Sequence, residues 1–179
     1  MMSKFKKVLR KINLMIYKPL SLINPQLYTK KVAKFYRKHG MNIEGEPFYF
    51  HSSIHFDGTD YGLITIGKGV SISKNVEFLT HDFSANTVFK GLELNNIKLL
   101  REQYEKDRLL SVKPIKVGAN TFIGLNVLLC PGSSIGNNCV IGAGTVVRGT
   151  IPDNSIAIGN PCRIIKKTSE WLEGKYNCE

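Results

Sequence analysis

One histidine stands where the sequence pattern changes, and its side chain could act as a general base. His81 lies in the segment NVEFLTHDF, residues 75–83, directly before a stretch of different composition. A neutral alcohol is a poor nucleophile, so acyl transfer to a hydroxyl needs a base that removes the proton as the new bond forms. An ordinary imidazole titrates at about pH 6.5, which suits that role. His81 is therefore our candidate base; the alternative is a surface histidine at the start of a loop.

Other residues near His81 could take part in chemistry, but each has an ordinary structural interpretation. Glu77 and Asp82 could orient the imidazole or a substrate hydroxyl, yet both fit as plain polar residues, and we assign neither a catalytic role. His51 and His55 are four residues apart in a strand or loop, where that spacing does not guarantee a shared face. A metal site would need more ligands, so no metal site is predicted.

The elements that position His81 follow from a repeat with a period of six residues. Every sixth residue from Ile66 onwards is large and apolar, with one gap: Ile66, Ile72, Phe78, Val117, Ile123, Leu129, Ile135, Ile141 and Val147. Four places later in each hexad stands a small or β-branched residue: Val70, Val76, Thr121, Val127, Ser133, Cys139 and Thr145. Glycine often follows the large residue directly, at Gly67, Gly118, Gly124, Gly136 and Gly142.

This pattern predicts an all-β fold, a parallel β-helix with a triangular cross-section. Each hexad makes one short flat strand and one corner; the large side chain fills the interior and the small one fits the corner. We expect the glycines to relieve the backbone where it bends sharply. Successive coils stack at the ordinary strand spacing of about 4.8 Å, so each coil is stabilised by its neighbours and the two ends need caps.

Helices are expected at both ends of the β-helix. Apolar residues recur at three and four from Phe5 to Ile16, which predicts an amphipathic helix that stops near Pro19. A second helix should run from Pro25 to about His39, with Gly40 ending it. A short helix should follow near Thr168 to Gly174. We divide the chain into a basic helical arm or cap (1–44), a β-helix domain (45–167) and a C-terminal helix and tail (168–179), and we expect the terminal helices to be the caps.

Two stretches should depart from the regular coil. Phe78 and Val117 are 39 residues apart, which is not a multiple of six, so an excursion loop with one short helix should leave the prism at about 82–114. The stretch from Phe48 to Ile54 keeps the register of Ile66, but Asp60 takes the intervening large position. The first coil should therefore be irregular.

The charge distribution and the apolar runs limit the class of protein. Of the net charge of +11, eleven basic residues precede the first acid, Glu44. We favour a solvated helix face over nucleic-acid binding, and keep peripheral contact with the inner membrane as a hypothesis. No apolar run approaches the roughly 20 residues that span a bilayer, and there is no signal-peptide core, so we expect a cytoplasmic protein. The four cysteines form no CxxC pair, which argues against a zinc or disulfide framework.

The run from Val117 to Lys167 resembles the terminal half of the hexapeptide-repeat acetyltransferases, the group that holds the maltose, galactoside, virginiamycin and polysaccharide O-acetyltransferases. NVEFLTHDF resembles their catalytic-histidine segment. The resemblance covers residues 45–170, and the tail IGNPCRIIKK, residues 158–167, is its most specific piece. It implies a left-handed β-helix, acetyl-CoA as cosubstrate with no metal, and a homotrimer with active sites between adjacent prisms.

The same resemblance implies roles for individual residues. The backbone amide of Leu125 would stabilise the oxyanion of the tetrahedral intermediate, and Phe122 would line the pantetheine channel. Relatives often have a small residue in place of Leu125 and a tryptophan in place of Phe122. The backbone of Ala143 would meet the pantetheine arm. Arg148 stands where relatives often have threonine or lysine, and it could equally be a solvated charge.

The basic residues of the tail complete the implied cofactor site. Arg163 and Lys166 match a basic pair beside the CoA phosphates, where opposite charge supplies affinity. The resulting hypothesis is an acetyl-CoA-dependent O-acetyltransferase that acts on a sugar or a surface-polysaccharide precursor such as O-antigen or capsule. Alternatives are a nucleotide-sugar N-acetyltransferase and a streptogramin or xenobiotic acetyltransferase. A zinc carbonic anhydrase of this fold would need three histidine ligands, and a solenoid without turnover remains a further alternative.

Overall fold

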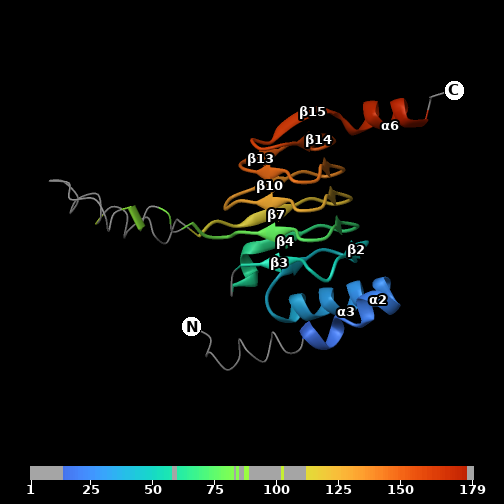
Figure 1. Ribbon diagram of the computed structural model, residues 1–179, viewed down its shortest axis with the longest axis vertical. Helices are drawn as coiled ribbons and strands as arrows, with labels where there is room; N and C mark the ends of the chain where they lie inside the picture. Colours follow the sequence, from blue (N-terminus) through green and yellow to red (C-terminus); the bar gives the residue numbers. More distant parts are fainter. Residues whose placement is uncertain are drawn as a thin grey trace.

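Three sheets, parallel except where β15 pairs with β14, form the walls of a triangular prism (Figure 1). The computed structural model describes residues 14–57, 60–82, 84, 87, 88, 102 and 112–176. The first sheet contains β1 (Asn42–Ile43), β4 (Ile64–Ile66), β7 (Ile115–Val117), β10 (Ser134–Ile135) and β13 (Thr150–Ile151). The second contains β2 (Tyr49–Phe50), β5 (Ser71–Ile72), β8 (Phe122–Ile123), β11 (Val140–Ile141), β14 (Ser155–Ile158) and β15 (Arg163–Lys167). The third contains β3 (His55–Phe56), β6 (Glu77–Phe78), β9 (Leu128–Leu129) and β12 (Val146–Val147).

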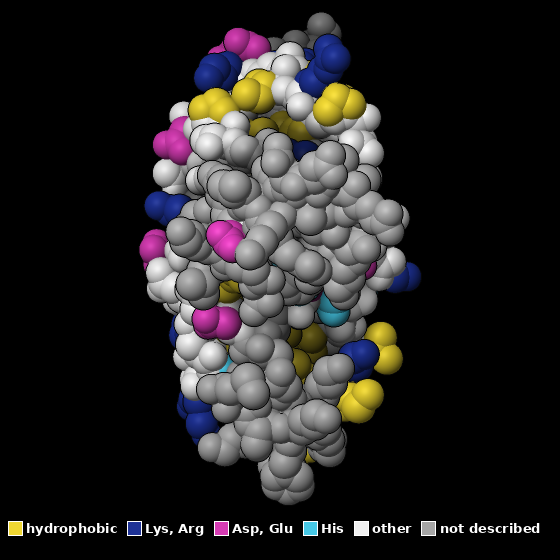
Figure 2. Space-filling model, turned by 90° about the vertical axis from the view of Figure 1, so that its left-hand side faces the viewer, with side chains coloured by type: hydrophobic (Ala, Val, Ile, Leu, Met, Phe, Trp, Pro, Cys, Tyr) yellow, Lys and Arg dark blue, Asp and Glu magenta, His cyan; other side chains and the backbone are white. Residues whose placement is uncertain are grey.

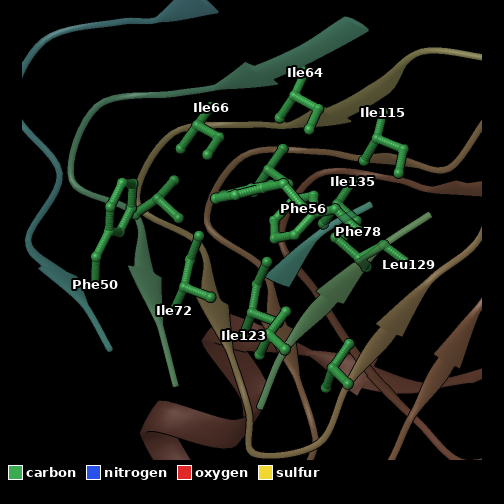
Figure 3. Packing of buried hydrophobic residues seen from close by; sticks show 14 of the residues in the cluster. Phe50, Phe56, Ile64, Ile66, Ile72, Phe78, Ile115, Ile123, Leu129 and Ile135 are labelled. Carbon is green, nitrogen blue, oxygen red and sulfur yellow. The ribbon is translucent and has the colours of Figure 1, made fainter. Parts of the chain in front are cut away.

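Each strand pairs with the strand one coil away, so equivalent residues stack in columns. Val117 pairs with Ile135, Ile123 with Ile141 and Leu129 with Val147, all in parallel register. The large apolar residues of the hexads form one such column on each wall, which we call the large column, and all of them are buried. Figure 3 shows several of them pointing inwards from the three walls. The small or β-branched residues four places later, which we call the small column, are buried too. The period of six and the assignment of its two columns are therefore confirmed.

The polar members of the small column also link one coil to the next. The Thr121 hydroxyl donates to the Gly136 carbonyl at 2.9 Å and accepts from the Cys139 N–H at 3.1 Å. Ser133 donates to the Val147 carbonyl at 2.9 Å. A hydroxyl that closes such a bond satisfies buried backbone groups that would otherwise be costly to leave unpaired.

The glycines that follow the large column are required by close approach rather than by a bend. A Cβ on Gly118 would lie 2.5 Å from the backbone carbon of Gly136 in the next coil, and a Cβ on Gly67 would lie 2.5 Å from the Ala119 nitrogen. Neither glycine has a positive φ. Our expectation that these glycines relieve a sharp bend was therefore wrong. Positive φ values occur elsewhere at the corners, for example at Gly69 and at Asn120.

The first coil is irregular, as expected, but its register differs from the one predicted. Phe50 pairs with Ile72 and Phe56 with Phe78, and both phenylalanines are buried. Phe48, which the predicted register placed in line with Ile66, is exposed. The 3-10 helix at Tyr61–Leu63 lengthens this coil, so counting in sixes back from Ile66 selects the wrong residues.

Helix α3 (Pro25–Lys38) covers the N-terminal end of the prism, which confirms the second predicted helix. The Asn24 side chain caps it by accepting from the Leu27 N–H at 2.9 Å, and Pro25 occupies its first turn. Its buried face includes Val32 and Tyr36, and the Tyr36 ring lies edge-on to Phe56 with centroids 4.9 Å apart. Burial of these apolar surfaces closes the open end of the core.

The other predicted helices have different outcomes. Residues 14–17 are helical and precede the four-residue α2 (Leu20–Ile23), but most of the helix predicted from Phe5 lies outside the described residues. The predicted C-terminal helix is α6 (Thr168–Tyr176). It buries none of its residues and extends away from the prism after β15, so it does not close its end as α3 does (Figure 1).

The excursion leaves the prism after β6 and returns at β7. His81 forms an antiparallel bridge with Val112, and the Lys113 N–H donates to the Thr80 carbonyl at 2.8 Å, so the two ends of the excursion lie side by side. The short helix predicted within it falls largely outside the described residues. Within the part of the chain that the structure describes, no helix is long and apolar enough to cross a membrane.

Candidate active site

His81 lies at the corner where the third sheet leads back to the first. It follows β6 by three residues, and its side chain is 33% exposed, so solvent or a substrate can reach the imidazole. Histidine side chains reach the surface on the face shown in Figure 2. The segment is fixed by the bridge to Val112 and by the pairing of β6 with β9.

A buried carboxylate orients this imidazole. His81 Nδ1 lies 2.7 Å from Oδ2 of Asp57, whose side chain is only 6% exposed. Asp57 directly follows β3, and its backbone N–H donates to the Phe78 carbonyl at 3.1 Å. Because an ionised carboxylate only accepts hydrogen bonds, this contact places a proton on Nδ1 and so selects the tautomer of the ring. In the neutral form of the ring, this tautomer has its lone pair on Nε2, the atom that could accept a proton.

Thr80 holds the Asp57 carboxylate in place. The Thr80 N–H donates to Oδ2 and the Thr80 hydroxyl donates to Oδ1, both at 2.9 Å. Thr80 is itself buried. Both oxygens of Asp57 are thus bound, so the carboxylate cannot turn away from His81 without breaking these hydrogen bonds.

Asp82 and Arg148 lie near the same corner. The backbone N–H and the hydroxyl of Ser84 are the main causes that lower the pKa of the fully exposed Asp82, and the charges of Arg148 and His81 lower it further. Arg148 directly follows β12 and is exposed. Among the predicted cofactor-binding residues, Arg148 therefore lies on the edge that carries His81.

The remaining predicted site residues gather on a different edge of the prism. Leu125 and Ala143 lie at successive corners between the second and third sheets, and the Gly144 N–H donates to the Leu125 carbonyl at 2.7 Å. Phe122 is on β8 in the second sheet and points outwards, 45% exposed. Within one chain, His81 and Leu125 therefore lie on opposite edges of the third sheet.

The basic tail residues lie at the C-terminal end of the second sheet. Arg163 and Lys166 are on β15, which pairs antiparallel with β14, opposite Ile158 and Ile156. Both are exposed. They therefore share the second sheet with Phe122, and the edge that carries Leu125 and Ala143 borders the same sheet.

Sequence reasoning missed Asp57 and Thr80. The acids considered were Glu77, which is exposed on the outer side of β6, and Asp82, which interacts with Ser84. A signal was present, because Asp57 follows Phe56 directly and Phe56 pairs with Phe78 just before the Leu79–Thr80–His81 segment. Within the described residues, no group of three or more histidine, cysteine or acidic side chains is arranged to hold a metal ion.

Comparison with known proteins adds a family and a fold. A family model described as "Bacterial transferase hexapeptide (six repeats)" matches residues 114–149. The galactoside O-acetyltransferase of Escherichia coli is 37% identical over 138 residues, which cover 75% of this chain and 59% of that protein. A Saccharomyces cerevisiae protein named as an acetyltransferase, with its activity not established, is 36% identical over 140 residues. The match covers 76% of this chain and 61% of that protein. The chain thus spans about three fifths of the length of these relatives.

A solved structure shares the architecture. The structure of a galactoside acetyltransferase in complex with coenzyme A superposes with a TM-score of 0.59 and 21% identity, over 97% of this chain and 86% of that one. The fold is accordingly a left-handed parallel β-helix of hexapeptide repeats, as predicted.

Proposed function

We propose that this chain, which belongs to the hexapeptide-repeat transferase family, is an acetyl-CoA-dependent O-acetyltransferase that acts on a sugar or a surface-polysaccharide precursor. The observation that carries the proposal is the contact between His81 and the buried Asp57, at 2.7 Å on an accessible corner of the prism. A base held in one tautomer next to solvent is what activation of a hydroxyl requires.

His81 is the general base in the proposed reaction. Its Nε2 removes the proton of the acceptor hydroxyl while that oxygen attacks the thioester carbon. Asp57 keeps the proton on Nδ1 and stabilises the imidazolium that forms. When the tetrahedral intermediate collapses, the C–S bond breaks, and the proton held by His81 passes to the departing thiolate. The products are the acetyl ester and CoA, and His81 returns to its starting state.

The backbone amide of Leu125 is the proposed oxyanion donor. Its corner is held by neighbouring coils, since the Leu125 carbonyl accepts from Gly144 at 2.7 Å and the Asn126 N–H donates to the Lys74 carbonyl at 3.0 Å. A donor fixed in this way needs no reorganisation as charge develops on the oxygen. The Leu125 residue is exposed at this corner.

The cosubstrate is proposed to lie along the second sheet. The cationic side chains of Arg163 and Lys166 would bind the CoA phosphates, and Phe122 and the Ala143 backbone would contact the pantetheine arm. All four are exposed on this side of the prism. Arg148, on the edge that carries His81, is proposed to contact cosubstrate from there.

Two copies of the chain are needed to bring these residues together. His81 and Leu125 lie on different edges of one prism. If prisms pack side by side, the His81 edge of one chain can face the Leu125 edge of the next. This geometry supports the predicted homotrimer, in which each of three equivalent sites combines residues of two chains. The predicted cytoplasmic location remains a prediction.

A hydroxyl acceptor is favoured over the alternatives by the relatives. The Escherichia coli relative is named a galactoside O-acetyltransferase. The test is a transfer assay with acetyl-CoA and a panel of paired hydroxy and amino sugars, with nucleotide sugars and a streptogramin included. We expect thiol release and an acetyl ester with a hydroxy sugar. Faster transfer to an amine or to the antibiotic would replace the proposal with one of the two alternatives.

Changing Asp57 to asparagine should lower kcat by about 10-fold to 100-fold with little change in the KM for acetyl-CoA. The amide keeps the shape but no longer enforces the Nδ1–H tautomer of His81 or balances the imidazolium charge. The measurement is the pH profile of kcat for both proteins. A positioning role predicts a shifted profile for Asp57→Asn, whereas equal loss at every pH together with a lower melting temperature would indicate a structural role only.

A further inference from the structure

The outer surface of the N-terminal cap exposes large apolar side chains. Helix α2 buries none of its residues, and Leu22 and Ile23 are 89% and 82% exposed. Three further apolar residues of the cap are exposed as well: Met15, Ile16 and Leu27. We call these five exposed residues the apolar tip. Large apolar side chains gathered at one end of a protein surface often mark a contact with a partner or a membrane.

The same end of the molecule is cationic. Five lysines of the cap are exposed: Lys18, Lys30, Lys31, Lys34 and Lys38. No acidic residue occurs between residues 14 and 43. Among residues 14–46, which the structure describes, Arg37 forms an ion pair with Glu46 at 3.2 Å, and this pair involves none of these lysines. At the lower right of Figure 2, basic and hydrophobic side chains lie next to one another.

We propose that the N-terminal cap docks onto a lipid bilayer that contains anionic headgroups. Leu22 and Ile23 would insert into the interface between headgroups and acyl chains, and the lysines would stay at the level of the headgroups. A bilayer offers a partner to both features, because its apolar layer takes the tip and its negative surface attracts the lysines. A nucleic acid would match the lysines but would leave Leu22 and Ile23 in water.

This docking would place the candidate active site near the membrane. Helix α3 lies across the N-terminal end of the prism, and His81 and Asp57 follow strands β6 and β3 of the coils closest to that end (Figure 1). Substrates at the bilayer surface would therefore be nearer to His81 than to the C-terminal helix. The docking itself does not depend on the proposed acetyl transfer and can be tested without any activity.

The test is co-sedimentation of the full chain with vesicles of phosphatidylcholine, alone or mixed with phosphatidylglycerol. We expect binding to the anionic vesicles, weakening as salt is raised, and little binding to the neutral ones. The double variant Leu22→Ser/Ile23→Ser should lower the partition coefficient by about tenfold or more, because two large apolar groups no longer insert. Lys30→Gln/Lys31→Gln should weaken binding to the anionic vesicles alone.

The matched control changes two exposed apolar residues at the opposite end, Leu172→Ser/Tyr176→Ser, and should bind as the unaltered chain does. Circular dichroism establishes that each variant is folded. Unchanged binding by Leu22→Ser/Ile23→Ser, or equal binding to neutral and anionic vesicles, overturns the proposal. A fall in oligomer size in that variant without a change in vesicle binding also overturns it, because the tip would then be a contact between copies.

Discussion

Replacing His81 with alanine is expected to lower kcat for acetyl transfer by about 10²-fold or more, with the KM for acetyl-CoA nearly unchanged. The imidazole is the group we propose to accept the proton of the hydroxyl, and loss of a general base costs rate rather than cosubstrate binding. The measurement is steady-state thiol release with the best acceptor from the sugar panel. His81 is only partly buried, so the substitution should leave folding intact.

The control for this experiment is a second histidine in the same sheet. His55 is exposed on β3, which pairs directly with β6, and His55→Ala should leave the rate within about twofold of the unaltered protein. If the His81→Ala protein retains the full rate, the base assignment is removed and the carboxylate of Asp57 loses its proposed role with it. If both histidine variants lose activity equally, a local structural change is the cause.

Replacing Gly118 with alanine should reduce the free energy of unfolding by about 3 kcal/mol. The new Cβ would lie 2.5 Å from the Gly136 backbone carbon, 2.6 Å from its oxygen and 2.7 Å from the Asn137 nitrogen. All three atoms belong to backbone, so the clash cannot be relieved by a side-chain rotation. One coil must move away from the next, which strains the hydrogen bond from the Gly118 N–H to the Ile135 carbonyl. Urea unfolding followed by circular dichroism measures the loss.

Gly174 provides the matched substitution. It lies in α6, and a Cβ there meets no atom within 4 Å. Gly174→Ala should therefore leave stability unchanged or raise it by up to about 1 kcal/mol through helix propensity. Equal stability of the Gly118 and Gly174 variants would show that the coils can separate at little cost, contrary to the close stacking described above.

The regular part of the prism could be predicted from the sequence because each hexad meets the same physical demand. Each wall of each coil places one large apolar side chain in the interior. Residues such as Ile123, Leu129 and Ile141 can therefore be assigned to the core from their spacing alone. Position along the chain was then enough to place His81 at the end of a strand. The handedness of the coil came from the resemblance, since a period of six fits either hand.

The surroundings of the candidate base were predicted less completely, because Asp57 comes from an irregular coil. Asp57 meets His81 only because Phe56 stacks on Phe78, and the 3-10 helix after Asp60 breaks the count of six between them. Spacing could not reveal that contact. The sequence also did not predict that His81 and Leu125 lie on different edges of the prism. The spacing of residues predicts the corners but not which corner would face a second chain.

The stacking of strands also determines the height of the prism. Because each wall strand pairs with the one directly above it, the height of the molecule can change only by complete turns, each adding about 4.8 Å. One more turn between β9 and β12 would lift the cationic strand β15 by that amount and leave both ends unaltered. If Arg163 and Lys166 bind the CoA phosphates as proposed, the height of the prism between them and His81 is therefore fixed by a whole number of coils.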